Sequence, residues 1–74
     1  MRALHEIAKE IRADWKNVHF AAAPYLSAMG SMEKVADDFG MDSGSSIVLY
    51  FLSNARSWRG ETAKRVKAEL RRMV

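Results

Sequence analysis

Cysteine is absent from this 74-residue sequence, which excludes two ways of stabilising a small domain. Without a thiol, the chain can form neither a disulfide nor a thiolate metal site. A chain of this length buries only about 60% of the surface that it exposes when unfolded. A small helical core or an oligomer interface must therefore stabilise it. We expect one helical domain over residues 1–74, of modest stability and located in the cytoplasm.

Long hydrophobic runs are also absent. The run at residues 47–52 has six consecutive apolar residues and would cover about 9 Å as a helix, whereas a membrane-spanning helix needs about 20 residues. The N-terminal residues 1–6 lack the charged region, apolar region and cleavage site of a secretory signal. We therefore expect no membrane segment and no cleaved leader.

Patterns that carry catalysis or metal binding are missing as well. The three serines around Gly44 do not form a G-x-S-x-G nucleophile elbow, and no phosphate-binding loop or dinucleotide fingerprint occurs. His5 and His19 are fourteen positions apart, so they cannot form a helical i, i+4 ligand pair. The acidic stretch near Asp37 and Asp42 does not have the spacing of a calcium loop. We expect no enzyme activity, no cofactor and no metal site.

Apolar residues recur at helical spacing along most of the chain. Leu4, Ile7 and Ile11 mark one face of a first helix, and Pro24 suits the first turn of a second because its missing amide has no intrahelical partner. The predicted helices are 2–17, 24–29 with a stop at Gly30, 32–39 with a cap at Ser31 and a stop at Gly40, 43–57 with a cap at Asp42 or Ser43, and 60–73. They predict an all-α fold, a small bundle of four or five short helices around a central apolar helix.

The apolar run 47–52 could form a strand or a helix, since it is rich in β-branched and aromatic residues. A strand needs a partner for its backbone groups, and the sequence contains no second strand-like run. We therefore predict that the run lies inside the helix 43–57. Because that helix is apolar nearly all round, we expect the other helices to surround it.

The segment 35–47 is similar to a helix-turn-helix pattern, with an apolar-Ala pair, a glycine turn and a second helix. The spacing from Gly40 to Ile47 is one residue longer than in the repressor-type pattern. The second helix would also present Ile, Val, Leu, Tyr and Phe where base-reading proteins use Arg, Asn or Gln. We therefore do not favour sequence-specific DNA reading by this pair.

Positive charge gathers near the C-terminus, although the net charge of +3 and the pI of about 9.6 are only mildly basic. At about 100° per residue, the basic side chains of the last helix share one arc opposite its apolar stripe. Such an arc could contact phosphates or an acidic protein surface, or simply face the solvent. The seven basic residues of this region are Arg56, Arg59, Lys64, Arg65, Lys67, Arg71 and Arg72, against two acids, Glu61 and Glu69.

Two tryptophans allow two interpretations. Trp58 lies between Arg56 and Arg59 in the turn before the last helix, where it could be an exposed contact residue or a lid over the core. We favour core closure because a small bundle needs its aromatic side chains, and the same holds for Trp15. Asn54 is expected to tie down the turn through side-chain hydrogen bonds.

Several short pieces together resemble a known group of proteins. They are Asp14-Trp-Lys16, Pro24-Tyr-Leu26 with Ala28-Met29, Ile47-Val-Leu-Tyr-Phe-Leu52, Asn54-Ala-Arg-Ser-Trp-Arg-Gly60 and Ala63-Lys64. These pieces are similar to small uncharacterised helical proteins encoded by bacteriophages and prophages. The resemblance covers most of the chain and carries no catalytic motif. It implies a phage accessory protein and leaves the activity open.

Two functional hypotheses follow. The first is a non-enzymatic protein-interaction module that binds itself or a host factor through the last helix and the 56–60 turn. The second is a nucleic-acid-binding protein that uses the same basic helix for phosphate contacts. Phosphate binding should weaken steeply with salt, whereas an interface anchored by Trp58 should tolerate salt.

Overall fold

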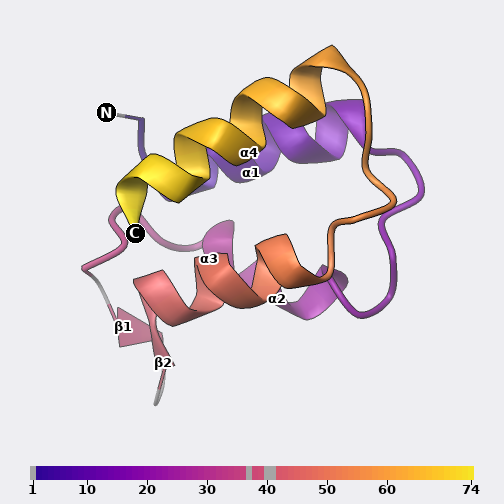
Figure 1. Cartoon of the computed structure of the whole chain (residues 1–74). Coiled ribbons are helices and arrows are strands. Elements are labelled where there is room, and N and C mark those ends of the chain that lie inside the picture. Colours follow the sequence, from indigo (N-terminus) through magenta and orange to yellow (C-terminus); the bar gives the residue numbers. More distant parts are fainter. Residues whose placement is uncertain (1, 37, 40–41) are drawn as a thin grey trace.

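The computed structural model describes residues 2–36, 38–39 and 42–74. Within these residues the chain forms four helices, α1 (Leu4–Asp14), α2 (Ala23–Met29), α3 (Gly44–Ser53) and α4 (Glu61–Met73) (Figure 1). Two strands of two residues each, β1 (Asp38–Phe39) and β2 (Asp42–Ser43), pair antiparallel just before α3. The all-α class predicted from the sequence is confirmed.

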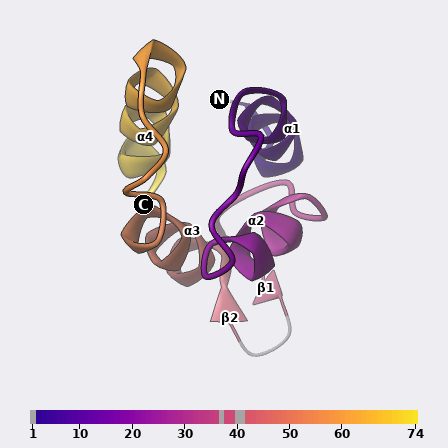
Figure 2. The same ribbon diagram turned by 90° about the vertical axis from the view of Figure 1, so that its right-hand side faces the viewer.

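The helices form two layers of two. Figure 2 shows α1 beside α4 in one layer and α2 beside α3 in the other, so the four helices enclose a shared core. The prediction that α3 is surrounded by the other helices is wrong in one respect. Leu49 and Tyr50 are 50% and 47% exposed, so one side of α3 faces the solvent. The apolar run is longer than the face that the core can cover.

The core takes its side chains from every helix and from the two loops that flank the aromatic cluster. Because the chain is short, the two tryptophans supply a large part of the buried apolar surface. The largest buried side chains include Leu4, Ile7 and Ile11 of α1, Leu26 and Met29 of α2, Ile47, Val48 and Phe51 of α3, and Val66 and Leu70 of α4, with Trp15 and Trp58 from the loops. The predicted core role of Trp15 is confirmed.

The N-terminus of α1 is held by the segment that was predicted to be a helix. The amides of Leu4 and His5 donate to the carbonyls of Glu33 and Met32, both at 2.9 Å. These contacts satisfy donors that the first turn of a helix cannot pair internally. The prediction of a helix over 32–39 is therefore wrong: residues 32–36 are irregular, with a turn at 35–36, and 38–39 form β1. The predicted stop at Gly40 lies outside the described residues, and the helix-turn-helix pattern lacks its first helix.

The start of α3 is fixed by a cap and by a close backbone approach. Ser43 is the N-cap, and its hydroxyl oxygen accepts from the amide of Ser46 at 3.2 Å, as predicted for one of the two candidate caps. Gly44 is buried against the backbone of Val35, whose carbonyl also accepts from the amide of Ser45 at 3.0 Å. The run 47–52 is thus helical, and the strand alternative is excluded.

The remaining helix ends follow local chemistry. Pro24 lies in the first turn of α2, as predicted, and Gly30 caps its end. Helix α3 stops at Ser53, four residues before the predicted end, where the amide group of Asn54 donates to the carbonyl of Tyr50 at 2.8 Å. This bond confirms the expected role of Asn54. It also frees residues 54–60 to form the loop that leads to α4.

Candidate functional site

Trp58 is a core residue, not a contact residue. Its side chain is 2% exposed and lies stacked on Trp15, with ring centroids 5.9 Å apart and planes inclined by 10°. The ring of Phe51 meets it edge-on at 6.5 Å. The indole Nε1 donates to Asp14 Oδ2 at 2.8 Å, which satisfies its one polar group. Core closure is confirmed, and the nearly complete burial of the ring argues against Trp58 as a contact residue.

Gly60 turns the chain from this cluster into α4. Its φ of +112° lies in a region that L side chains rarely adopt. Nothing lies within 4 Å of an added Cβ, so glycine is required here by the backbone and not by space. The carbonyl of Gly60 accepts from the amide of Lys64 at 3.0 Å and begins the helix. The Gly60 turn therefore sets the direction in which α4 leaves the loop.

Four basic side chains line one hollow along that flank, which we call the basic groove. Lys64, Lys67 and Arg71 follow an i, i+3, i+7 spacing and so lie on one side of α4, while Arg59 comes from the loop. The hollow has a volume of about 450 Å³, and one acidic residue, Glu61, also lines it. Within the described part of the chain, no carboxylate forms an ion pair with these four cations. The groove is thus a local concentration of positive charge.

Lys67 is the deepest cation of the basic groove. Its Nζ donates to the carbonyl of Trp58 at 2.6 Å and lies 5.8 Å from the centroid of the Trp58 ring. Burial lowers the pKa of Lys67, and repulsion from Arg71 and Arg59 lowers it further. Because an anion would screen that repulsion, the groove is electrostatically ready for a negatively charged group.

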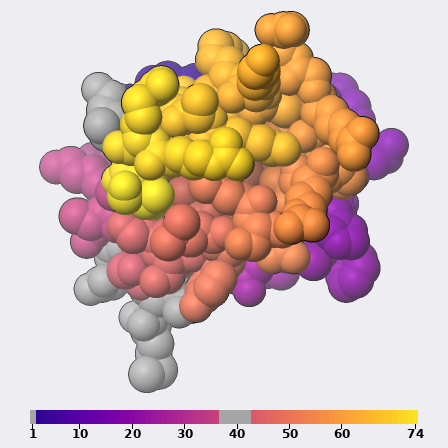
Figure 3. Space-filling view, in the orientation of Figure 1, coloured from indigo at the N-terminus to yellow at the C-terminus, as the bar shows by residue number. Residues whose placement is uncertain are grey.

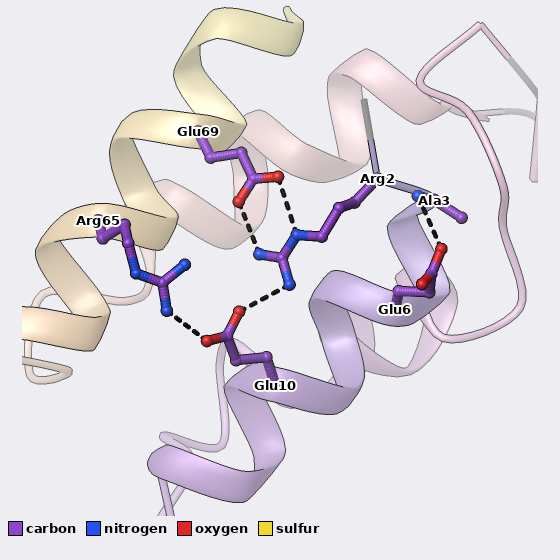
Figure 4. A network of polar contacts seen from close by, with 6 residues as sticks. All are labelled: Arg2, Ala3, Glu6, Glu10, Arg65 and Glu69. Carbon is purple, nitrogen blue, oxygen red and sulfur yellow. Dashed lines mark hydrogen bonds and ion pairs between the residues drawn. The ribbon is translucent and has the colours of Figure 1, made fainter.

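The opposite flank of α4 is occupied by an ion-pair network with α1 (Figure 4). Arg2 donates to both oxygens of Glu69, at 3.0 and 2.6 Å, and its Nη1 lies 2.8 Å from Glu10 Oε1. Arg65 binds the other oxygen of Glu10. Hydrogen bonds from Arg65 and then Arg2 lower the pKa of Glu10, and the bond from Arg2 lowers that of Glu69. This network joins α1 to α4.

The predicted single arc of basic residues is therefore divided. Arg65 serves the network with α1, whereas Lys64, Lys67 and Arg71 line the basic groove. A helix has two flanks beside its buried stripe, and charges spread over more than about 100° of arc reach both of them. Arg72 is exposed; it does not line the basic groove and forms none of the contacts described for the network with α1.

A second, smaller hollow is lined by residues 53–57 of the segment that leads from α3 into the 54–60 loop, without residue 55. Arg56 lines it together with His19, and its volume is about 250 Å³. The His19 ring meets Phe20 edge-on, at 4.7 Å between centroids, and Phe20 is 82% exposed. The sequence reasoning missed Phe20. The available signal was a large aromatic residue that lies outside the apolar stripes of the predicted helices.

No group of three or more His, Asp or Glu side chains that could hold a metal ion occurs in the described residues. Within the same residues, no helix is long and apolar enough to cross a membrane. Comparison with known proteins gave no match among family models, curated proteins or solved structures. The candidate site therefore rests on the geometry of the basic groove.

Proposed function

We propose that this chain is a small binding module whose basic groove contacts the phosphate backbone of nucleic acid. The observation that carries the proposal is the set of four cations in one hollow, without a paired carboxylate in the described residues. Phosphate contacts of this kind supply most of the affinity of nucleic-acid binding that is independent of sequence. The groove contains no Asn or Gln for reading base edges. We therefore expect little sequence preference.

The dimensions of the basic groove are compatible with this partner. Lys64 and Arg71 are seven residues apart on α4, which is about 10 Å along a helix axis. Successive phosphates of one duplex strand advance by about 3.4 Å along the duplex axis, so the groove extends over about three nucleotide steps. Arg59 lengthens it at the N-terminal end of α4. A few phosphate contacts, and modest affinity, are the expected outcome.

Burial of Trp58 weakens the protein-interaction hypothesis at this surface. That hypothesis used Trp58 as the anchor of the interface, because tryptophans in interfaces carry much of the binding energy. With the ring 2% exposed, the surface of α4 and the 54–60 loop offers mainly charge. Charged surfaces govern association rate and salt dependence more than they provide an apolar anchor.

The direct test is fluorescence anisotropy of labelled 12-nucleotide single strands and 12-base-pair duplexes at about 50 and 200 mM salt. With four phosphate contacts, the slope of log affinity against log salt on the duplex should be about −3.6. The double variant Lys64→Gln/Arg71→Gln should lose two contacts, so the slope should become about −1.8.

The matched control removes two positive charges from α1 instead of two from the basic groove. Lys9 and Arg12 are exposed and line neither of the two hollows beside the 54–60 loop. The control Lys9→Gln/Arg12→Gln should therefore bind almost as the parent chain does. The proposal fails if the parent binds neither DNA at the lower salt, or if the control loses as much affinity as the groove variant.

Exposed apolar residues on the other layer support a second candidate, a protein-interaction module that self-associates. Leu49 and Tyr50 are about half exposed, and Tyr25 of α2 lies 5.3 Å from Tyr50 between ring centroids. Exposed tyrosines are common in protein interfaces. Sedimentation at micromolar concentrations tests this candidate: Tyr50→Ala should reduce association, and a strictly monomeric parent would contradict a dimer. The phage relationship, the cytoplasmic location and the lack of enzyme activity stay predictions from the sequence.

A further inference from the structure

We propose that the nucleic acid taken by the basic groove is single-stranded and that Phe20 stacks on one of its bases. This inference rests on the proposed function and narrows its ligand class. Proteins that bind single strands without sequence preference combine a positively charged path for the backbone with aromatic side chains on which bases stack. In this protein the basic groove supplies the positively charged path, and the exposed ring of Phe20 supplies the aromatic side chain.

Phe20 is an exposed aromatic residue outside the core. Its side chain is 82% exposed, the highest value among the large hydrophobic residues that the structure describes. It lies outside the buried core, and its recorded ring contact is the edge-on contact with His19, which is itself exposed. An exposed Phe buries little area in the folded chain and presents a free ring face to the solvent. Such a face is the surface on which a base stacks.

The Phe20 ring lines neither hollow itself, but it contacts His19, which lines the smaller one. His19 and Arg56 line the same hollow with polar side chains of Ser53, Asn54 and Ser57. The α1–α2 loop that carries His19 and Phe20 and the α3–α4 loop that carries Arg56 lie next to each other at one edge of the molecule (Figure 3). An arginine in such a hollow can contact a phosphate or stack on a base. The edge of the molecule that carries Phe20 thus also carries the positive charge of Arg56.

The two hollows are close enough to serve one strand. Arg56 lines the smaller hollow, and Arg59 lines the basic groove. Three peptide steps separate these residues, so their Cα atoms are at most about 11 Å apart. A strand that leaves the basic groove past Arg59 therefore reaches Arg56 within a few nucleotides. A stacked duplex keeps its bases inside and exposes a base face only at its two ends.

The experiment compares a labelled dT12 strand with a 12-base-pair duplex against the parent chain at one salt concentration. A duplex carries more charge per unit length than a single strand, so charge alone favours the duplex. Tighter binding of dT12 is therefore the expected result and cannot come from the basic groove by itself. Equal or tighter binding of the duplex would overturn the inference and leave the proposed function standing. Binding of neither probe would overturn both.

Variants of Phe20 test the stacking contact directly. Phe20→Ala should weaken dT12 binding by roughly 5- to 150-fold, the range measured for stacked bases, and leave duplex binding unchanged. Phe20→Tyr keeps a ring and should restore binding. Leu49→Ala is the matched control, because Leu49 is an exposed apolar residue of α3, outside the α1–α2 loop that carries His19 and Phe20. Unchanged dT12 affinity in Phe20→Ala, or an equal loss in Leu49→Ala, would overturn the inference.

Discussion

Truncation of Trp58 separates a core role from a contact role most sharply. The buried indole stacks on Trp15, meets Phe51 edge-on and donates to Asp14. Removal of a buried Trp side chain costs about 3 to 5 kcal/mol in free energy of unfolding. At about 0.05 to 0.15 kcal/mol per residue, a chain of this length has only about 4 to 11 kcal/mol in total. Trp58→Ala should therefore lose a large part of its stability or unfold.

Milder variants keep the prediction measurable if Trp58→Ala does not fold. Trp58→Phe retains an aromatic ring and loses the Nε1 hydrogen bond with some buried area, so we expect a cost of about 1 to 2 kcal/mol. Asp14→Ala removes the acceptor of the same bond and should cost about 1 kcal/mol. If the bond is the shared cause, the double variant should cost less than the sum of the two single variants.

The assay is urea denaturation followed by far-UV circular dichroism, since Trp15 would complicate a fluorescence signal. The midpoint concentration should fall while the slope of free energy against urea stays the same. DNA affinity of folded Trp58→Phe should stay close to that of the parent chain, because the main-chain carbonyl that accepts from Lys67 is retained. The core assignment is refuted if Trp58→Ala unfolds with nearly the parent free energy and loses partner binding, because that combination describes an exposed contact residue.

Three further predictions concern the local devices of the fold. Gly44→Ala would place its Cβ 2.5 Å from the Val35 carbonyl oxygen, so we expect a loss of about 1 to 3 kcal/mol in thermal or urea unfolding. Ser43→Ala removes the α3 cap and should cost about 1 kcal/mol, whereas Ser43→Asp should retain most of the stability. The lowered pKa of Glu69 implies that its ion pair contributes stability above about pH 4.5 and loses it as the pH falls further. Since Arg2 is about a third exposed, solvent screening limits that contribution to about 1 kcal/mol. Arg2→Gln should therefore remove this part of the acid sensitivity, measured by urea unfolding at pH 7 and pH 3. An unchanged pH dependence of the unfolding free energy would contradict the prediction.

The helices with a regular apolar stripe could be predicted from the sequence. In α1, the i, i+3, i+4 spacing of Leu4, Ile7 and Ile11 is sufficient, because any helix with that stripe must bury it. In α4, Val66 and Leu70 do the same. The segment 32–39 also shows helical spacing, yet its first residues are irregular, since the carbonyls of Met32 and Glu33 pair with the free amides of α1. A contact between segments about 28 residues apart decided this, and local periodicity cannot report it.

The candidate site was predictable in part. The concentration of basic residues after residue 56 was visible in the sequence, but its division into two flanks was not. Arg65 is directed to α1 because Glu10 lies across from it in the folded chain, and this pairing depends on how α1 and α4 pack side by side. The position of Phe20 outside the apolar stripes was visible in the sequence, but its exposure was not, because Phe is among the residue types that are most often buried.

The sequence by itself determined the all-α class, the proline start and glycine end of α2 and the surplus of positive charge, because each depends on residues close together in the chain. The tertiary structure alone decided which charges remain unpaired and which aromatic rings reach the solvent. Where α4 packs against α1, Arg65 forms an ion pair with Glu10, whereas Lys64 and Arg71 line the basic groove on the other flank. Stacking of Trp15 on Trp58 buries both rings, while Phe20 stays outside. These outcomes depend on contacts between residues far apart in sequence, for which a single sequence carries no local signal.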